Sequence, residues 1–500
     1  MIRFVTIALC AALAACSQTD LSRVRVAQGE AQGVVENGVR VFRSLPYAAA
    51  PVGELRFRGP RPAPSWEGVR DATAPGPMCV QNAEGADWGP WTGSFTTHGP
   101  ISEDCLTLSV WTPARSRTAR LPVMVWIPGG GLTDGGEASP IYDGQALARQ
   151  GVIVVTINYR LNAFGMLAHP DIEPEEDGGR GNNPVRDAIA ALQWVRDNIE
   201  AFGGDPARVT IVGQSAGGAI AYILLDAPQA SGLFSAAILQ SAPPGSELLP
   251  DRAAAEALSV QAGQALNARS AADLRSADAA AVLGLEQRFN LYVDGVLIRD
   301  PEFATPPYVN DVPIMTGITA DELSFLQPNL SSHQRESARR GAEFAALYPA
   351  SDEASARDAS LRSTREAALV GLERWARATQ GGAPAYMYLW THTLPGQNAD
   401  IYRAFHSAEV IYVFGSLARA PERPFTDADR DISARTVEYW ANFIKTGDPN
   451  GTSGGAWPRA DTETPVFMEL GDHFAPLPPL PENVREYWNR SYDAEGAYQF

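Results

Sequence analysis

Short apolar runs that alternate with helical patterns constrain the fold of this chain most strongly. Six runs are rich in β-branched and aromatic residues, and segments with helical spacing lie between them. This alternation is typical of a mainly parallel sheet covered by helices on both faces. The expected strands are 121–127, 152–157, 209–212, 236–240, 312–318 and 385–390. Neither an internal repeat nor a long linker interrupts the 500 residues, so we predict one α/β domain.

Apolar residues at helical spacing predict the covering helices. One helix is expected to begin near Asn183 and Pro184 and to run to about residue 199, and a second follows Ser215. A long helix is expected over 427–444. The Ala-rich segment 246–286 and the segment 331–380 are expected to form small exposed helices inserted above the sheet.

The first residues have the pattern of an export signal. Arg3 precedes an apolar run, residues 4–15, that is too short to span a bilayer but suits a signal peptide. The sequence LAAC, residues 13–16, resembles the lipobox of bacterial lipoproteins, which implies that Cys16 is lipidated and begins the mature chain. Plain secretion is the alternative. In either case the signal segment, residues 1–16, lies outside the folded domain, and the single domain, 17–500, leaves the cytoplasm for the periplasm or cell envelope, or is secreted.

Charge and cysteine content narrow the function classes. The formal net charge is −18 and the single lysine is Lys445, so nucleic-acid binding, a P-loop and a Schiff-base lysine are excluded. We expect no cofactor and no metal, and contact with a membrane only through the lipid anchor. Cys79 and Cys105 are the cysteines outside the signal segment, and two thiols outside the cytoplasm indicate one disulfide.

The sequence RVTIVGQSAGG, residues 208–218, places a serine at the junction of an expected strand and an expected helix. Small residues flank Ser215, as a sharp strand-to-helix turn with an exposed nucleophile requires. A serine needs an imidazole to accept its proton. The turn resembles the nucleophile turn of α/β-hydrolases, in which the base comes later in the chain than the serine. Among the four later histidines, we favour His406 because it lies on a loop after the strand 385–390; surface or structural roles are expected for His392 and His473.

Two further elements of acyl-transfer chemistry follow other expected strands. Asp321 and Glu322 come directly after 312–318, and their spacing does not choose which one orients the histidine. The glycine run 129–131 follows the strand 121–127 and exposes backbone N–H groups that can stabilise an oxyanion. The N–H group of Ala216 is a third candidate donor.

Long stretches of the sequence resemble the type B carboxylesterase family. The stretch FGGDPARVTIVGQSAGG, residues 202–218, is similar to the active-site signature of that family, and EDCLTLSVWTP, residues 103–113, is similar to its second signature. The resemblance covers nearly the whole mature chain. It implies an α/β-hydrolase fold with helical insertions over an active-site gorge, and a bridge between Cys79 and Cys105.

The same resemblance implies a role for each candidate residue. Ser215 is the nucleophile, His406 the general base, and Glu322 rather than Asp321 the acid of the triad. The residues implied to form the oxyanion hole are Gly130, Gly131 and Ala216. The implied activity is hydrolysis of carboxylic esters through an acyl-enzyme. The alternatives are a catalytically silent interaction protein of the same fold, or a peptidase or acyltransferase that uses the same serine.

Departures from the family pattern bear on the substrate. Gln214 stands where many members have glutamate, which weakens the case for a cationic substrate and favours small or medium uncharged esters. Trp88 and Trp91 lie in the expected disulfide loop, where an apolar wall or packing is favoured over a cation site. The candidate pocket residues are Leu132, Gln214, Trp88, Phe289, Phe303 and Phe325.

Overall fold

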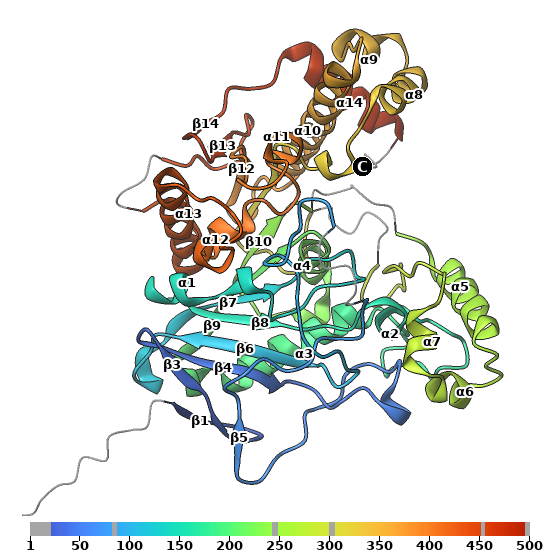
Figure 1. Cartoon of the computed structure of the whole chain (residues 1–500), viewed down its shortest axis with the longest axis vertical. Coiled ribbons are helices and arrows are strands. Elements are labelled where there is room, and N and C mark those ends of the chain that lie inside the picture. The colour runs from blue at the N-terminus through green and yellow to red at the C-terminus, as the bar shows by residue number, and fades with distance from the viewer. Residues whose placement is uncertain (1–21, 83–87, 243–248, 300–305, 452–455, 496–500) are drawn as a thin grey trace, which may run out of the picture.

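An 11-stranded sheet runs through the molecule in the computed structural model, which describes residues 22–82, 88–242, 249–299, 306–451 and 456–495 (Figure 1). The strand order is β14-β13-β12-β11-β10-β9-β7-β8-β6-β4-β3. The strands are β3 (Val34–Glu36), β4 (Val39–Pro46), β6 (Thr107–Thr112), β7 (Leu121–Ile127), β8 (Ile153–Ile157), β9 (Gly204–Gln214), β10 (Ala236–Gln240), β11 (Ile314–Thr319), β12 (Ala385–Trp390), β13 (Phe467–Leu470) and β14 (Phe474–Pro476). The six expected strands are confirmed as β7 to β12, and the predicted α/β-hydrolase architecture is confirmed with them.

The strands from β8 through β13 in this order pair in parallel, whereas β3, β4, β6 and β14 join antiparallel at the two sides. The strands that precede the parallel part of the sheet are divided between two sheets. One part extends the main sheet, and β1 (Arg23–Val26), β2 (Gly29–Gln32) and β5 (Val69–Asp71) form a separate three-stranded sheet.

The direction in which the chain adds strands across the sheet changes at the neighbouring parallel strands β7 and β9. The chain leaves β7 toward β8 on one side and leaves β9 toward β10 on the other. Right-handed connections that run in opposite directions place their helices on opposite faces and open a crevice at the carboxyl ends of the two strands. Accordingly α1 (Gln145–Arg149) packs with α13 (Asp427–Thr446), and α3 (Asn183–Asn198) packs with α4 (Ala216–Asp226).

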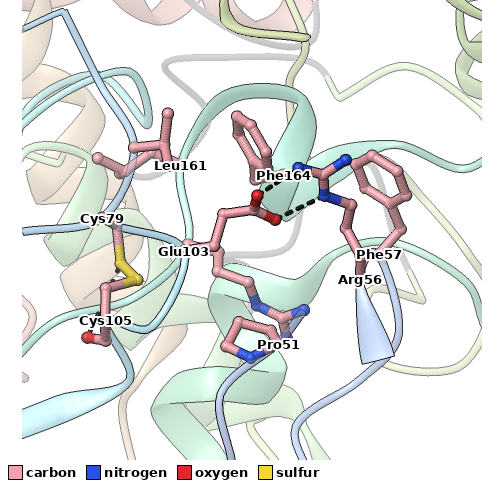
Figure 2. Close-up of a pocket in the computed structure, with 10 residues that line it drawn as sticks. Pro51, Arg56, Phe57, Cys79, Glu103, Cys105, Leu161 and Phe164 are labelled. Carbon is pink, nitrogen blue, oxygen red and sulfur yellow. Dashed lines mark hydrogen bonds and ion pairs between the residues drawn. A yellow bond between two sulfur atoms is a disulfide. The ribbon is translucent and has the colours of Figure 1, made fainter. Parts of the chain in front are cut away.

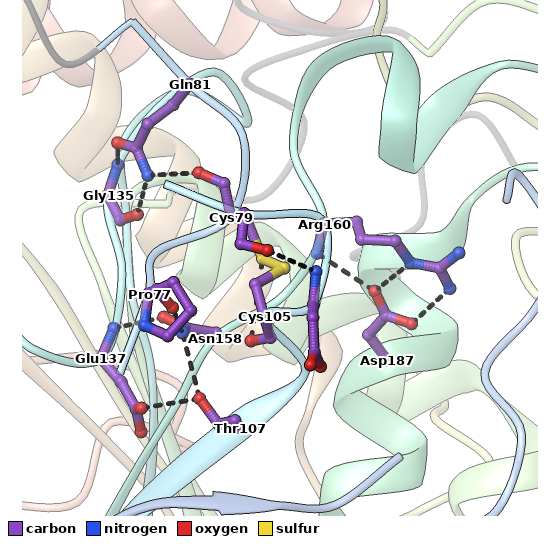
Figure 3. Close-up of a disulfide and its surroundings, with 12 residues drawn as sticks. Pro77, Cys79, Gln81, Cys105, Thr107, Gly135, Glu137, Asn158, Arg160 and Asp187 are labelled. Carbon is purple, nitrogen blue, oxygen red and sulfur yellow. Dashed lines mark hydrogen bonds and ion pairs between the residues drawn. A yellow bond between two sulfur atoms is a disulfide. The ribbon is translucent and has the colours of Figure 1, made fainter. Parts of the chain in front are cut away.

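Short helices and buried polar pairs fix the loops that surround this crevice. The short helices are α2 (Asn162–Met166), α11 (Ala399–Tyr402) and α12 (Val410–Val413). Arg160 and Asp187 form a buried two-pronged ion pair, in which Nε and Nη2 donate to the carboxylate at 2.9 and 2.6 Å. The disulfide Cys79–Cys105 lies near this pair, as Figure 3 shows. The predicted disulfide is thereby present in the structure.

The inserted helices form two groups outside the sheet (Figure 1). The first group is α5 (Arg252–Ala265), α6 (Ala271–Ser276) and α7 (Ala279–Leu283), and the second is α8 (Leu330–Arg340), α9 (Ala342–Leu347), α10 (Glu353–Ala378) and α14 (Glu482–Glu495). The expectation of small exposed helices over 331–380 is wrong for α10. This 26-residue helix buries a long face, because Trp488 and Tyr492 of α14 pack in a second apolar cluster against it.

A cavity beside the disulfide is separate from the crevice. It lies among Arg56, Glu103 and Phe164, where the Arg56 guanidinium forms an ion pair with the Glu103 carboxylate (Figure 2). Its volume of about 10 Å³ is room for roughly one water molecule. This cavity is therefore too small to hold a substrate. Within the described ranges, no helix combines the length and apolar character needed to cross a membrane.

Candidate active site

The carboxyl ends of four parallel strands bring the candidate catalytic residues to one edge of the sheet. The glycine run follows β7, Ser215 follows β9, Glu322 follows β11, and His406 lies on the loop after β12. Parallel strands direct their carboxyl ends to the same edge, so these loops surround the crevice between β7 and β9, where the strand order switches direction. Segments nearly 300 residues apart in sequence thus meet at one site.

Ser215 occupies a strained turn between β9 and α4. Its φ of 56° and ψ of −127° lie outside the regions that serine ordinarily adopts. Glycine is required around it, because a Cβ atom on Gly217 would lie 2.0 Å from the Ile127 carbonyl oxygen. A Cβ atom on Gly213 would lie 2.2 Å from the carbonyl oxygen of Gly217. The predicted sharp turn is therefore present, with the amino end of α4 directly after the serine.

Glu322 and His406 form a buried pair. His406 Nδ1 donates to Glu322 Oε2, and the backbone N–H of Thr319 donates to Glu322 Oε1 at 2.7 Å. Burial alone would raise the pKa of Glu322, but the charge and hydrogen bond of His406 lower it overall. Burial acts to lower the pKa of His406, but the charge and hydrogen bond of Glu322 raise it above its ordinary value. The pair thus favours an ionised carboxylate and a basic imidazole.

The other imidazole nitrogen of His406 contacts Gln214. Gln214 Nε2 lies 3.2 Å from His406 Nε2. An imidazole whose Nδ1 proton is held by Glu322 has its acceptor at Nε2, so the Gln214 amide donates to it. Among the described residues, the imidazole therefore bonds to the residue that precedes Ser215 and not to the Ser215 hydroxyl. The Ser215 hydroxyl must therefore replace the Gln214 amide at Nε2 before it can give its proton to His406. Catalytic hydrogen bonds of this kind often tighten only when substrate binds.

The glycine run folds back against the serine. A Cβ atom on Gly129 would lie 3.2 Å from Ser215 Cβ, which places the run directly beside the elbow. Gly130 and Gly131 have φ values of 115° and 59°, and the Gly130 carbonyl accepts from Thr133 and Asp134 N–H, each at 3.0 Å. Ala216 is the first residue of α4, where N–H groups have no partner within the helix. This arrangement suits the predicted oxyanion-hole roles.

Asp321 has a different position from its neighbour Glu322. Its N–H donates to the Ala404 carbonyl at 3.0 Å, and its carboxylate accepts from the Ala404 N–H at 3.4 Å. Asp321 therefore connects the loop of the candidate acid to the loop of the candidate base. Glu322, which the resemblance implies to be the acid, is the carboxylate that bonds to the imidazole.

The remaining histidines with described contacts lie in other networks. His392 is between Asp472 and Asp429, at 2.5 and 3.0 Å. His333 is buried and contacts the Tyr348 carbonyl at 2.8 Å. Both positions fit the structural roles of satisfied histidines. Over the described residues, no group of three or more histidine, cysteine or acidic side chains is arranged to hold a metal ion.

Glu409 is a buried acid that the sequence analysis missed. Gln240 Nε2 donates to Glu409 Oε1 at 3.0 Å, and the Gln240 carbonyl accepts the N–H of Ser215 at 2.9 Å. Burial raises the pKa of Glu409 to about 7, and the charge of Glu322 adds to this effect. The available signal was an acid three residues after the histidine and directly before the apolar run VIYV.

The candidate pocket residues lie in different parts of the structure. Trp88 and Phe325 pack together near His406, Gln214 contacts it, and Leu132 is a buried residue of the glycine-run loop. Phe289 belongs to the main apolar core, and Phe303 and Cys16 lie outside the described residues. Trp91, left out of the predicted pocket, stacks on Trp88 at a centroid distance of 5.1 Å. The repeated tryptophan in WGPW was the signal for it.

The fold and the site define a serine hydrolase of the α/β-hydrolase class. The Carboxylesterase family model matches residues 20–369 and 342–486. The chain is 35% identical to para-nitrobenzyl esterase of Bacillus subtilis, over 87% of this chain and 92% of that protein. It is 34% identical to cocaine esterase of Oryctolagus cuniculus, over 95% of each chain. A carboxylesterase structure from Geobacillus stearothermophilus aligns with a TM-score of 0.78 and 33% identity, over 93% of this chain and all of that one. The chain belongs to the carboxylesterase family and is a carboxylic ester hydrolase.

Proposed function

We propose that the protein hydrolyses small or medium uncharged carboxylic esters with Ser215 as nucleophile, His406 as general base and Glu322 as the orienting acid. The observation that carries this proposal is the buried Glu322–His406 pair, whose second imidazole nitrogen, Nε2, contacts Gln214, the residue next to Ser215. Ser215 Oγ attacks the ester carbonyl, and its proton passes through His406 to the leaving alkoxide. Gly130, Gly131 and Ala216 donate to the oxyanion, and water then releases the acyl group.

The absence of charge at Gln214 supports an uncharged substrate. Glutamine beside the nucleophile supplies hydrogen bonds but no charge to attract a cationic ester. The activity named for the Bacillus subtilis relative, hydrolysis of a para-nitrobenzyl ester, is consistent with this class.

Hydrolysis of p-nitrophenyl acetate by the purified protein and its Ser215→Ala variant tests the proposal. We expect the variant to lose on the order of 10⁶ in kcat while its unfolding temperature stays within a few degrees of wild type. A fluorophosphonate probe should label the wild-type protein and not the variant. Wild-type activity that survives the substitution would reject Ser215, and a folded wild type without activity or labelling would favour the silent interaction protein.

We propose also that the protein is exported and anchored through lipidated Cys16. The lipobox-like LAAC sequence supports this proposal. In a bacterial host, the full-length chain should sediment with membranes and release a lipid-modified Cys16 peptide, whereas Cys16→Ser should abolish both. A soluble periplasmic protein with an unmodified amino terminus would show plain secretion instead.

A further inference from the structure

The loop that carries the candidate oxyanion donors turns back on itself within a few residues. The Gly130 carbonyl accepts the N–H groups of Thr133 and Asp134. A Cβ atom on Gly130 would lie 2.0 Å from the Asp134 carbonyl oxygen, and a Cβ atom on Gly135 would lie 2.5 Å from the Gly129 carbonyl oxygen. The returning segment thus packs directly against the glycine run, so a displacement of Gly135 shifts the residues assigned to the oxyanion hole.

Gly135 depends on outside contacts to keep its position. Its φ of 102° lies in a region that few other residues adopt, and it has no side chain to pack. Other parts of the loop are held through their carbonyl groups. The Tyr159 hydroxyl donates to the Pro128 carbonyl at 2.7 Å, and Asn162 Nδ2 donates to the Thr133 carbonyl at 2.8 Å.

Gln81 supplies the contact that fixes Gly135, as Figure 3 shows. The Gly135 N–H donates to Gln81 Oε1 at 2.9 Å, and Gln81 Nε2 donates to the Gly135 carbonyl at 2.8 Å. The side-chain amide thus pairs with both backbone groups of one residue, as a neighbouring strand would. Gln81 Nε2 also donates to the Cys79 carbonyl at 3.0 Å. Only 4% of Gln81 is exposed, so these three bonds are shielded from water.

The disulfide connects Gln81 to the sheet that carries the nucleophile. Cys79 lies two residues before Gln81 and is bonded to Cys105, which comes two residues before β6. Strand β6 belongs to the same 11-stranded sheet as β9, which ends at the residue before Ser215. Gln81 therefore holds Gly135 in a fixed position relative to the serine.

We infer that Gln81 is a positioning residue that holds the oxyanion hole in its catalytic geometry. The inference rests on the proposed function, in which Gly130, Gly131 and Ala216 donate to the oxyanion. Negative charge develops on the carbonyl oxygen only as the bond from Ser215 Oγ forms, and again when water attacks the acyl-enzyme. A shifted N–H group therefore loses transition-state stabilisation and leaves substrate binding nearly unchanged.

The kinetics of Gln81→Met test the inference, because methionine keeps the length of the side chain and removes all three hydrogen bonds. For p-nitrophenyl acetate, kcat and kcat/KM should both fall by about tenfold to 10²-fold, with KM changed less than about twofold. Rates are normalised to the fraction of protein that a fluorophosphonate labels at completion. Gln145→Met is the matched control, because Gln145 is also buried and its amide bonds to Asn37 and Glu36. It should leave kcat unchanged.

Inhibition by trifluoroacetophenone shows whether the loss arises at the oxyanion. Ser215 Oγ adds to the carbonyl carbon of this ketone, the carbonyl oxygen becomes the oxyanion of a hemiketal, and the serine proton passes to His406. The inhibition constant should rise in Gln81→Met by about the factor by which kcat/KM falls. An inhibition constant that stays at the wild-type value would overturn the inference.

Gln81→Glu provides a second variant at the same position. A neutral carboxyl can accept from and donate to the Gly135 backbone, whereas a carboxylate can only accept. Burial favours the neutral form, so the kcat of Gln81→Glu relative to wild type should rise as the pH is lowered from about 8 to about 6. The same ratio for Gln81→Met should stay constant. If Gln81→Met does not fold, a constant ratio for Gln81→Glu overturns the inference.

The remaining outcomes distinguish this inference from the proposed function. Wild-type kcat in Gln81→Met, a loss equal to that of Gln145→Met, or a rise in KM alone would each overturn the inference and leave the ester hydrolase intact. A folded wild type that does not hydrolyse p-nitrophenyl acetate would contradict the proposed function, and the inference with it.

Discussion

At the scale of single residues, Gln214 contacts Nε2 of His406, the imidazole nitrogen that Glu322 does not bind. The amide donates to neutral imidazole, and the same side chain turned by 180° would present its oxygen to imidazolium. Gln214 can therefore serve both protonation states without adding charge. The charged or titratable groups that act on the imidazole are then Glu322, to which it is bonded, and Glu409 on its own loop.

Replacing this amide by an isosteric carboxylate should change the pH dependence of the reaction. Gln214→Glu places a negative charge beside Nε2, which stabilises imidazolium and raises the pKa of His406 further. His406 must be neutral to act as a base, so the acid limb of the kcat/KM profile should move upward by about one pH unit. Gln214→Met removes the hydrogen bond without adding charge and should show no upward shift. An unmoved limb in Gln214→Glu would contradict the contact described here.

At the scale of elements, neighbouring residues after β11 have separate tasks. Glu322 points at the imidazole, whereas Asp321 bonds to the backbone of Ala404 on the His406 loop. On α10, Arg365 donates to the Ala320 carbonyl at 3.3 Å and Asp358 pairs with Arg403 at 2.7 Å. The long inserted helix thus supports both loops of the acid–base pair.

Amide substitutions should separate the two carboxylates. Glu322→Gln leaves the shape of the pair but no longer holds the Nδ1 proton, so kcat for p-nitrophenyl acetate should fall by about 10⁴. Asp321→Asn keeps an acceptor for the Ala404 N–H and should cost less than about tenfold. Steady-state rates, normalised to the fraction of protein that a fluorophosphonate labels, measure both effects. If the larger loss followed Asp321→Asn, the assignment of the acid would be wrong.

Elements whose conformation depends on neighbouring residues could be predicted from the sequence. The strands follow from runs of β-branched residues, and the sharp turn at Ser215 follows from the glycines around it. The burial of α10 could not be predicted in this way, because Trp488 and Tyr492, which pack against it, lie more than 100 residues downstream of the helix. The contact of Gln214 with His406 spans 192 positions and depends on how two loops meet. Resemblance selected Glu322 over Asp321 where spacing could not.

At the scale of the whole molecule, buried acids link stability to pH in opposite directions. Glu322 and Asp429 have lowered pKa values, that of Asp429 about 2, because favourable interactions outweigh burial: the charge and hydrogen bond of His406 for Glu322, and hydrogen bonds for Asp429. They stabilise the fold above their unfolded pKa, and this contribution is lost as the pH falls. Glu137 and Glu409 have pKa values raised by burial to about 7, so the fold prefers them neutral.

Glu137 offers the cleaner test of this linkage, because the proposed mechanism does not use it. Its carboxyl lies in the polar network beneath the glycine-run loop, where Thr107 Oγ1 donates to Oε1 at 2.9 Å (Figure 3). Between its ordinary pKa of 4.5 and about 7, the unfolded chain releases a proton that the folded chain keeps. The free energy of unfolding therefore falls as the pH rises through this window, by on the order of 3 kcal/mol at 1.36 kcal/mol per unit.

Glu137→Gln mimics the neutral acid and should remove this part of the pH dependence. We expect urea unfolding to give the variant and wild type similar stabilities at pH 4.5, and the variant to be more stable by about 2–3 kcal/mol at pH 8, because only the wild type must then bury a carboxylate or keep its proton at a cost. Glu67→Gln, at an exposed position, makes the same change of charge and should show no such divergence. A difference between variant and wild type that is the same at both pH values would mean that Glu137 is ionised in the fold throughout the range.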